Sequence, residues 1–197
     1  WFADSISTTP IHQGPTYQTP VLYDDATYYA EAKAGSLAQY VGPYDYSIGT
    51  SSSYANTTYY QYFDVLKPEG ITIKSIDVFP STAPGEAYTI QLLNSGGTVL
   101  QTYSGVTTVQ SGQREVVPVN FNVPYGTEFR VKFGVSGGFY RNTTGASYPY
   151  VIPNVISING NSFTGYPQYY YFFYNWKVSG EGCSSDRVPD TAHVELM

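Results

Sequence analysis

The sequence is poor in charged residues, and basic residues are the scarcest. Asp, Glu, Lys and Arg make up 12% of the 197 residues, and nine of these are Lys or Arg. The formal net charge is −6 at pH 7. Because binding to a phosphate backbone depends on clustered Lys and Arg, this composition excludes nucleic acid as a partner.

Long apolar runs are also missing. A helix that spans a membrane needs about 20 consecutive, mostly apolar residues, and no stretch of this sequence approaches that length. We therefore expect no insertion into a membrane. Residues 1–10 read like the interior of a domain rather than a signal peptide, which predicts that the chain is a part of a longer protein.

Cysteine and histidine, which many catalytic and metal sites use, are nearly absent. Cys183 is the single cysteine, so it is either an ordinary small residue or the partner of a cysteine outside this sequence. The two histidines, His12 and His193, lie near the two ends of the sequence. Nucleophilic catalysis needs Ser, Cys or Thr beside a base, and zinc needs three or four ligands. We therefore predict that the protein is not an enzyme.

The carboxylates raise two further possibilities, glycoside hydrolysis and calcium binding. A glycosidase needs two carboxylates at a defined separation. The sequence spacing of the carboxylates in the body favours no particular pair. These carboxylates are Asp45, Asp64, Glu69, Asp77, Glu86, Glu115 and Glu128. Asp24, Asp25 and Asp45 could supply oxygen ligands to a structural calcium ion, although no D-x-D-x-D loop is present. We expect no cofactor, with structural calcium as the one option left open.

Tyrosine, glycine and proline are abundant, with 22 Tyr, 19 Gly and 13 Pro. Aromatic and β-branched residues favour strands, whereas Gly and Pro favour turns. Short apolar stretches between turn residues predict an all-β protein, an antiparallel β-sandwich of jelly-roll or Ig-like type. We expect strands at 27–32, 58–66, 70–79, 87–94, 98–103, 114–121, 127–135, 154–159 and 168–178.

Turn residues and apolar alternation refine three of these predictions. The NSGG sequence at 94–97 separates two alternating stretches and predicts a hairpin. The PYG sequence at 124–126 predicts a second hairpin in the same way. The apolar phase changes between Ile73 and Ile76, which predicts a β-bulge near Ser75.

The two ends of the chain carry motifs of a known family. Residues 1–32 begin with Trp-Phe, contain G-x-T-x-x-T-P and end with TYYAEA. They resemble the last part of the Ig-like modules in large secreted proteins of Cytophaga and Flavobacterium relatives. Residues 182–194, GCSSDRVPDTAHV, resemble the segment that ends the same repeating unit, with a departure at Asp190. The body, with QLLNSGGTVLQT and VNFNVPYGTEFRV, looks like a β-sandwich module of those proteins.

The resemblance implies a secreted or cell-surface protein of a Bacteroidetes-type bacterium, often exported by the type IX pathway. It implies the end of an Ig-like module or a linker at 1–33, a β-sandwich module at 34–178, and a linker or the start of a next module at 179–197. Ser5 and Thr191 resemble O-glycosylation acceptors of such bacteria. No catalytic role is implied, because these modules accompany peptidases, glycoside hydrolases and adhesins alike.

The aromatic strand at 168–178 is the first candidate binding surface. Flat aromatic rings stack on sugars, and each aromatic contact contributes about 0.5–1.5 kcal/mol. Period-2 alternation sends one set of side chains into the core, namely Tyr170, Phe172, Tyr174, Trp176 and Val178. The opposite set begins with Tyr169, Tyr171 and Phe173. It faces outward together with Tyr60 and Tyr62 of the strand at 58–66. This outer face is either a tyrosine platform or a surface covered by loops.

The loop at 137–150 is the second candidate, because binding residues concentrate on loops held by a rigid scaffold. Its planar and hydrogen-bonding side chains are Tyr140, Arg141, Asn142, Tyr148 and Tyr150. Arg141 either contacts a ligand or pairs with a carboxylate such as Asp64 or Asp45.

These observations favour a non-catalytic accessory module that binds a polysaccharide or cell-surface glycan through exposed tyrosines. Its expected partners are that glycan and other domains of the same polypeptide. A structural spacer without a ligand and a protein–protein adhesion module are the alternatives. A binding module needs exposed aromatic rings, a spacer buries them, and an adhesion module shows a contiguous apolar patch.

Overall fold

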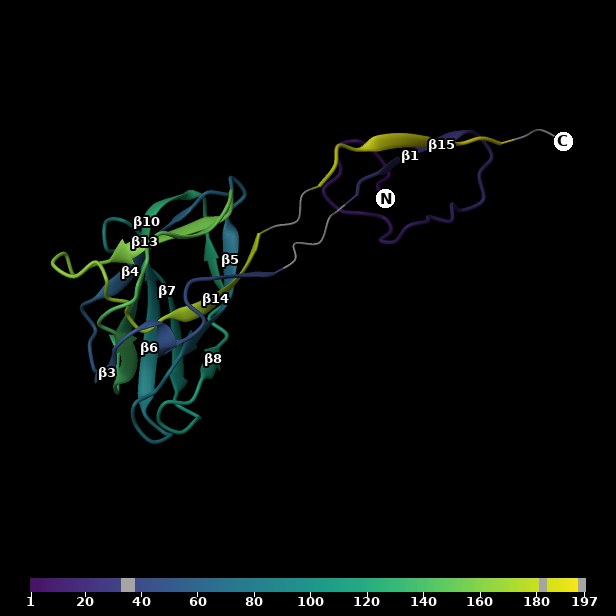
Figure 1. The fold of residues 1–197 in the computed structure, drawn as a ribbon. Coiled ribbons are helices and arrows are strands. Elements are labelled where there is room, and N and C mark those ends of the chain that lie inside the picture. Colours follow the sequence, from purple (N-terminus) through teal and green to yellow (C-terminus); the bar gives the residue numbers. More distant parts are fainter. Residues whose placement is uncertain (33–37, 181–183, 195–197) are drawn as a thin grey trace. The chain divides into compact units, whose positions relative to one another are not determined.

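The computed structural model describes residues 1–32, 38–180 and 184–194, and it divides the chain into two compact units (Figure 1). One unit, here called the sandwich, comprises residues 37–181, close to the predicted body at 34–178. The other, here called the flanking unit, comprises residues 1–36 and 182–197. Strands account for nearly all the regular structure, and the described residues contain no helix long and apolar enough to cross a membrane.

The larger sheet of the sandwich has six antiparallel strands. In spatial order they are β12 (Tyr150–Ile152), β13 (Ile156–Asn161), β4 (Tyr60–Val65), β10 (Gly126–Val135), β6 (Ala87–Leu93) and β7 (Val99–Val106). Alternation on β4 buries Phe63 and Val65 and leaves Tyr60, Tyr62 and Asp64 partly exposed on the outer face, which confirms the prediction for this strand.

The smaller sheet packs against the inner face of the larger one. Its strands, in spatial order, are β2 (Gln39–Val41), β14 (Tyr174–Gly180), β5 (Ile71–Val78) and β8 (Glu115–Val117), and β9 (Phe121–Val123) also pairs with β5. A separate ribbon joins β3 (Ser51–Tyr54) to β11 (Phe139–Asn142), next to the short 3₁₀ helix η1 (Tyr46–Ile48).

The core lies between the two sheets, so the predicted antiparallel β-sandwich is confirmed. Phe63 and Val131 from the larger sheet and Ile73 and Trp176 from the smaller sheet are all fully buried in one cluster. Burying a side chain of this size contributes about 1.5–3 kcal/mol. The apolar residues that alternate along each strand therefore both hold the sheets together and set which face of each strand remains outside.

One of the two predicted hairpins is confirmed. Residues 94–97 join β6 to β7, where the Gly97 N–H donates to the Asn94 carbonyl at 3.0 Å. Residues 124–126, by contrast, connect β9 in the smaller sheet to β10 in the larger one. The second hairpin prediction is therefore wrong, because turn residues mark a reversal of the chain without specifying which strand becomes the partner.

The predicted bulge on β5 is confirmed. Ser75 pairs with Lys177 and Ile73 pairs with Val178, so Lys74 has no partner of its own on β14. This extra residue changes the phase of β5 and places Ile76 on the same inner face as Ile73.

The predicted outer face of 168–178 is wrong for Tyr171 and Phe173. The strand β14 begins only at Tyr174, and Phe172 adopts φ +64° before it. This left-handed conformation breaks the period-2 alternation, so consecutive side chains no longer point to opposite faces. All five aromatic residues from 170 to 174 are fully buried.

The flanking unit brings the two ends of the sequence together. Strand β1 (Ala26–Ala30) pairs antiparallel with β15 (Val188–Ala192). The guanidinium of Arg187 lies 3.5 Å from the ring centroid of Phe2 and pairs with Glu31 at 3.1 Å. The two end segments, which the sequence patterns suggested as separate pieces, thus form one compact unit.

Candidate functional site

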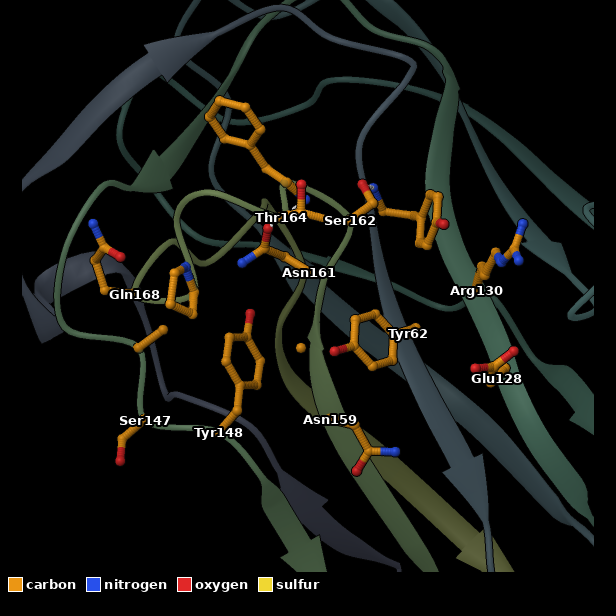
Figure 2. Close-up of a pocket in the computed structure, with 15 residues that line it drawn as sticks. Tyr62, Glu128, Arg130, Ser147, Tyr148, Asn159, Asn161, Ser162, Thr164 and Gln168 are labelled. Carbon is orange, nitrogen blue, oxygen red and sulfur yellow. Dashed lines mark hydrogen bonds between the residues drawn. The ribbon is translucent and has the colours of Figure 1, made fainter.

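A cleft of about 720 Å³ opens on the outer face of the larger sheet (Figure 2). We call it the tyrosine cleft. Strands β4, β10 and β13 form its floor and one wall, and residues 146–148 and 162–168 form the rest. The side chains that give it its chemistry are Tyr60, Tyr62, Glu128, Arg130, Tyr148, Asn159, Thr164 and Gln168.

Two tyrosines reach the cleft because they alternate with core residues on β4. Tyr60 and Tyr62 are two positions apart, so both project from the outer face of the sheet. Both are partly exposed, whereas Gln61 between them is fully buried. Figure 2 shows the Tyr62 hydroxyl pointing toward the middle of the cleft.

A bulge on β13 shapes the floor. Ile158 pairs with Phe63 and Gly160 pairs with Tyr62, so Asn159 is an extra residue between them. A bulge re-aims the side chain at its position. The Asn159 amide points outward and donates to the Asp64 carboxylate at 2.8 Å, which fixes its orientation beside the cleft.

Gly160 makes room for the Tyr62 ring. A Cβ atom at this position would lie 2.7 Å from Cζ of Tyr62, closer than real side-chain contacts allow. The bare backbone of Gly160 therefore lets the ring of Tyr62 lie flat against β13. Any larger residue would push the ring and its hydroxyl out of the present position.

Arg130 and Glu128 supply charge to one wall of the cleft, opposite Gln168 and Ser147 (Figure 2). The Arg130 guanidinium carbon lies 4.9 Å from the centroid of the Tyr60 ring, a cation–π contact. Its Nη2 also donates to the carbonyl of Ser95, so its position is held from two sides.

Tyr148 forms part of the opposite wall and is firmly held. Its hydroxyl hydrogen-bonds the side-chain amide of Gln61 at 2.6 Å and donates to the carbonyl of Tyr169 at 3.1 Å. Its ring stacks on Tyr170 with an interplanar angle of 14°. Burial raises the pKa of Tyr148 far above its ordinary value, so the hydroxyl stays protonated.

Arg141 lies in a box of aromatic rings rather than beside a carboxylate. Its guanidinium carbon is 4.3 Å from the Tyr54 ring centroid and 5.0 Å from that of Tyr169, and Nη1 donates to the Tyr171 hydroxyl at 3.1 Å. Its Nε is buried without a hydrogen-bond partner. Within 1–32, 38–180 and 184–194 no carboxylate forms an ion pair with Arg141, which corrects the predicted pairing with Asp64 or Asp45.

Asn142 and Tyr171 are fully buried, so the prediction that they contact a ligand is corrected. The Asn142 amide donates to the carbonyl of Tyr46 at 2.9 Å, and its oxygen accepts from the Tyr174 hydroxyl at 2.8 Å. Asn142 thereby satisfies backbone groups near η1 that would otherwise be buried without partners. Burial raises the pKa of Tyr171 to about 12, and the nearby Arg141 acts against this shift.

The remaining predicted site residues are partly buried in packing contacts. Tyr140 stacks on Tyr46 at 4.9 Å between ring centroids. The Tyr150 hydroxyl accepts a hydrogen bond from the Ser147 N–H at 2.9 Å, and Tyr169 packs against the core. Among the predicted site residues that the structure describes, Tyr148 is the one that lines the tyrosine cleft.

Sequence patterns missed Arg130, Asn159 and Gln168. Arg130 alternates with the buried Phe129 and Val131, so its outward direction follows from the sequence. Its position opposite Tyr62 does not, because that depends on the register between β10 and β4. The bulge at Asn159 carries no sequence signal that we recognise.

The calcium hypothesis finds no assembled site in the part of the chain that the structure describes, whereas the modification hypothesis stays a prediction. The described residues contain no group of three or more His, Cys, Asp or Glu side chains arranged to hold a metal ion. Asp25 pairs with His193 at 2.7 Å, and Asp45 accepts a hydrogen bond from the Ser47 N–H at 2.8 Å. Ser5 and Thr191 are exposed in the flanking unit, and Cys183 lies outside the described residues.

Comparison with known proteins gives no family. No family model matches the chain, and no curated protein matches it. A chain in the structure of the infectious bursal disease virus Gx strain matches at 15% sequence identity with a TM-score of 0.23. The match covers 96% of this chain and 44% of the viral chain. A TM-score this low supports no inference about fold or function.

Proposed function

We propose that the chain is a non-catalytic accessory module that binds a polysaccharide or cell-surface glycan in the tyrosine cleft. The main support for this proposal is that Tyr60 and Tyr62 both project from β4 into a cleft that is lined by hydrogen-bonding side chains. Sugars present apolar C–H faces and polar hydroxyl edges, so they need both kinds of contact at once. Asn159, Gln168 and Thr164 are placed to contact the hydroxyls.

The cleft is preorganised for a weakly polar ligand. Tyr148 is fixed through Gln61, Asn159 is fixed through Asp64, and Arg130 is fixed over Tyr60. Side chains that are already ordered lose little entropy when a ligand binds, which favours affinity. Each stacked ring adds about 0.5–1.5 kcal/mol beyond the area that it buries.

A binding role is favoured over glycoside hydrolysis by the carboxylates around the cleft. Hydrolysis of this kind uses two carboxylates, and Glu128 is the one carboxylate among the lining residues that the structure describes. Neighbouring Asp64 accepts hydrogen bonds from the Glu128 N–H at 2.8 Å and from Asn159. Both of its oxygens are thus engaged in holding the cleft together.

We further propose that the module belongs to a secreted or cell-surface protein of a Bacteroidetes-type bacterium and acts beside other domains of the same polypeptide. The motifs in residues 1–32 and 182–194 support this proposal. They support a place in a larger secreted protein without indicating which activity the neighbouring domains have.

Affinity electrophoresis on gels containing soluble neutral polysaccharides tests the proposal. The 197-residue chain should be retarded by at least one of xyloglucan, glucomannan and mixed-linkage β-glucan. Tyr62→Ala should weaken the affinity about tenfold, as expected for losing one stacked ring. Gly160→Ala should also weaken it, because the added Cβ displaces the Tyr62 ring.

Tyr125→Ala is the matched control, since Tyr125 is 64% exposed in the turn between β9 and β10 and does not line the cleft. This variant should bind like the unmodified chain. Retardation that is unchanged in Tyr62→Ala, or no retardation on any gel, would overturn the proposal.

A structural spacer is the second candidate. It is favoured by the burial of Tyr170, Tyr171 and Tyr174, which places much of the tyrosine content in the core. A cooperatively folded chain that binds none of the polysaccharides would favour this role.

A further inference from the structure

The outer face of the smaller sheet carries a second cluster of tyrosines and cations. On β14 and β2, Trp176 and Val41 point into the core, so Lys177 and its partner Tyr40 point outward. On β5 and β8, Val78 and Val117 point inward, so Asp77 and its partner Val116 point outward. We call this surface the Arg114 face, and its side chains are Tyr40, Tyr44, Asp77, Arg114, Asn175 and Lys177.

Arg114 is held in place by a buried carboxylate. Its Nε lies 3.4 Å from Oδ2 of Asp77, which is 2% exposed and also accepts from the Asn175 amide at 2.9 Å. Nη2 of Arg114 donates to the carbonyl of Tyr44 at 3.4 Å. These contacts engage Nε and one N–H of Nη2, so most of the guanidinium N–H groups remain for another acceptor.

Tyr44 covers Arg114 and presents its other side to solvent. The guanidinium carbon is 3.8 Å from the centroid of the Tyr44 ring. Tyr44 is 64% exposed, whereas the Arg114 side chain is 29% exposed. The cation therefore lies between the ring and the sheet, and the opposite side of the ring is open to a ligand.

Tyr40 on β2 repeats this arrangement with Lys177 on β14. Lys177 Nζ lies 5.9 Å from the Tyr40 ring centroid, and Tyr40 is 58% exposed. The two tyrosines are four residues apart, which is at most about 13 Å along an extended chain. Two exposed rings at this separation, each with a cation beside it, match a short stretch of a linear ligand.

The Arg114 face is basic in a chain that is acidic overall. Nine residues of the whole sequence are Lys or Arg, against a net charge of −6. Arg114 and Lys177 lie on this face, and Lys74 is exposed at the bulge of the same sheet. Asp77, which pairs with Arg114, and Asp45, which also interacts with Arg114, balance two of these three cations, so this face keeps one net positive charge. The surface is therefore complementary to a negatively charged ligand.

We propose that the Arg114 face binds an acidic polysaccharide, a chain of sugars that carry carboxylate or sulfate groups. Sugar rings stack on the open sides of Tyr44 and Tyr40. Acidic substituents bind the free N–H groups of Arg114 and the ammonium group of Lys177, since Arg presents a planar fork that matches a carboxylate or sulfate. This site lies on the opposite sheet from the tyrosine cleft and does not depend on the function proposed there.

Affinity electrophoresis with charge-matched polymers tests this assignment. The 197-residue chain should be retarded by polygalacturonate more than by fully methyl-esterified polygalacturonate, which has the same backbone without the charge. Parallel gels with dextran sulfate and dextran distinguish sulfate from carboxylate as the preferred group. Tyr44→Ala and Lys177→Gln should each weaken the binding about three- to tenfold, and binding should weaken as salt rises.

Matched control variants place the binding on this face. Tyr125→Ala removes an equally exposed tyrosine, and Lys132→Gln removes a lysine from the outer face of the larger sheet, and both variants should bind normally. Tyr62→Ala should also bind the acidic polymers normally, which separates this site from the cleft. Equal retardation by the charged and esterified polymers would overturn the proposal. The proposal would also be overturned if Tyr44→Ala and Lys177→Gln bound the acidic polymers as tightly as the unmodified chain.

Discussion

Arg141 shows how one side chain can resemble a binding residue and yet act in the interior. Three tyrosines surround its guanidinium, and its only direct hydrogen bond among the described residues goes to the Tyr171 hydroxyl. Arg is more weakly hydrated than Lys and stacks on aromatic faces, so it can be buried in this way. We infer that Arg141 stabilises the packing of residues 169–171 against β3.

Arg141→Ala should lower the free energy of unfolding by about 2–4 kcal/mol. The change removes a desolvated cation–π cluster, and it leaves the buried Tyr171 hydroxyl without a partner. Urea denaturation followed by tyrosine and tryptophan fluorescence should show a lower midpoint with an unchanged slope. A midpoint equal to that of the unmodified chain, together with lost polysaccharide binding, would instead make Arg141 a ligand contact.

Asp77 is the residue whose protonation should matter for stability. Burial raises the pKa of its carboxyl above the ordinary 3.8, and the Asn175 amide and Arg114 oppose this rise without cancelling it. The folded chain therefore holds the proton more tightly than the unfolded chain. The resulting stabilisation is fully present below the ordinary pKa and is lost as the pH rises through the folded-state pKa.

Asp77→Asn should become more stable relative to the unmodified chain as the pH rises from about 3 to about 7, since asparagine does not titrate. Urea denaturation of both proteins across this range measures the difference. A difference that stays constant, or that changes in favour of the unmodified chain, would contradict the raised pKa.

At the scale of single elements, left-handed residues decide where strands start and turn. Phe172 at φ +64° lies in the irregular segment just before β14, and Gly97 at φ +85° lies in the turn between β6 and β7. Such conformations cost little for glycine and more for residues with a Cβ atom. The aromatic packing around Phe172 offsets that cost in the core, whereas the exposed turn depends on glycine.

Gly97→Ala should destabilise the sandwich by about 1 kcal/mol, because alanine is strained at φ +85°. Gly96→Ala is the matched control, since Gly96 has no positive φ and an added Cβ would meet Asn94 Oδ1 at an ordinary 3.4 Å. Thermal denaturation should therefore place the melting temperature of Gly97→Ala clearly below that of Gly96→Ala. Equal melting temperatures would show that the turn tolerates a different conformation.

At the scale of the whole molecule, the sandwich presents two distinct polar surfaces on opposite sheets. The tyrosine cleft is concave, with one charge of each sign on its wall, and we assign it to a neutral glycan. The Arg114 face carries open tyrosine rings and one net positive charge, and we assign it to an acidic glycan. Two weak sites on one rigid body raise the overall affinity for a mixed polysaccharide surface when both can engage.

Alternation and turn residues predicted a large part of the fold. Tyr60, Tyr62 and the bulge near Ser75 follow from local patterns, and the structure confirms them. Short strands such as β2 and β11 were missed, because three or four residues carry too little periodicity. The candidate site was predicted poorly, since Tyr148 is the predicted site residue that reaches the cleft.

The sequence by itself determined that this is an antiparallel β-sandwich with few charges, because strand periodicity and turn chemistry are local properties of the chain. Strand alternation predicts that both Tyr62 and Tyr171 face outward, and the tertiary structure decided that only Tyr62 does so. Tyr171 and Tyr62 have similar sequence surroundings, yet one is fully buried and the other lines a cleft. The difference arises from a left-handed residue at 172 and a bulge at Asn159, and these depend on contacts between strands that are distant in the sequence.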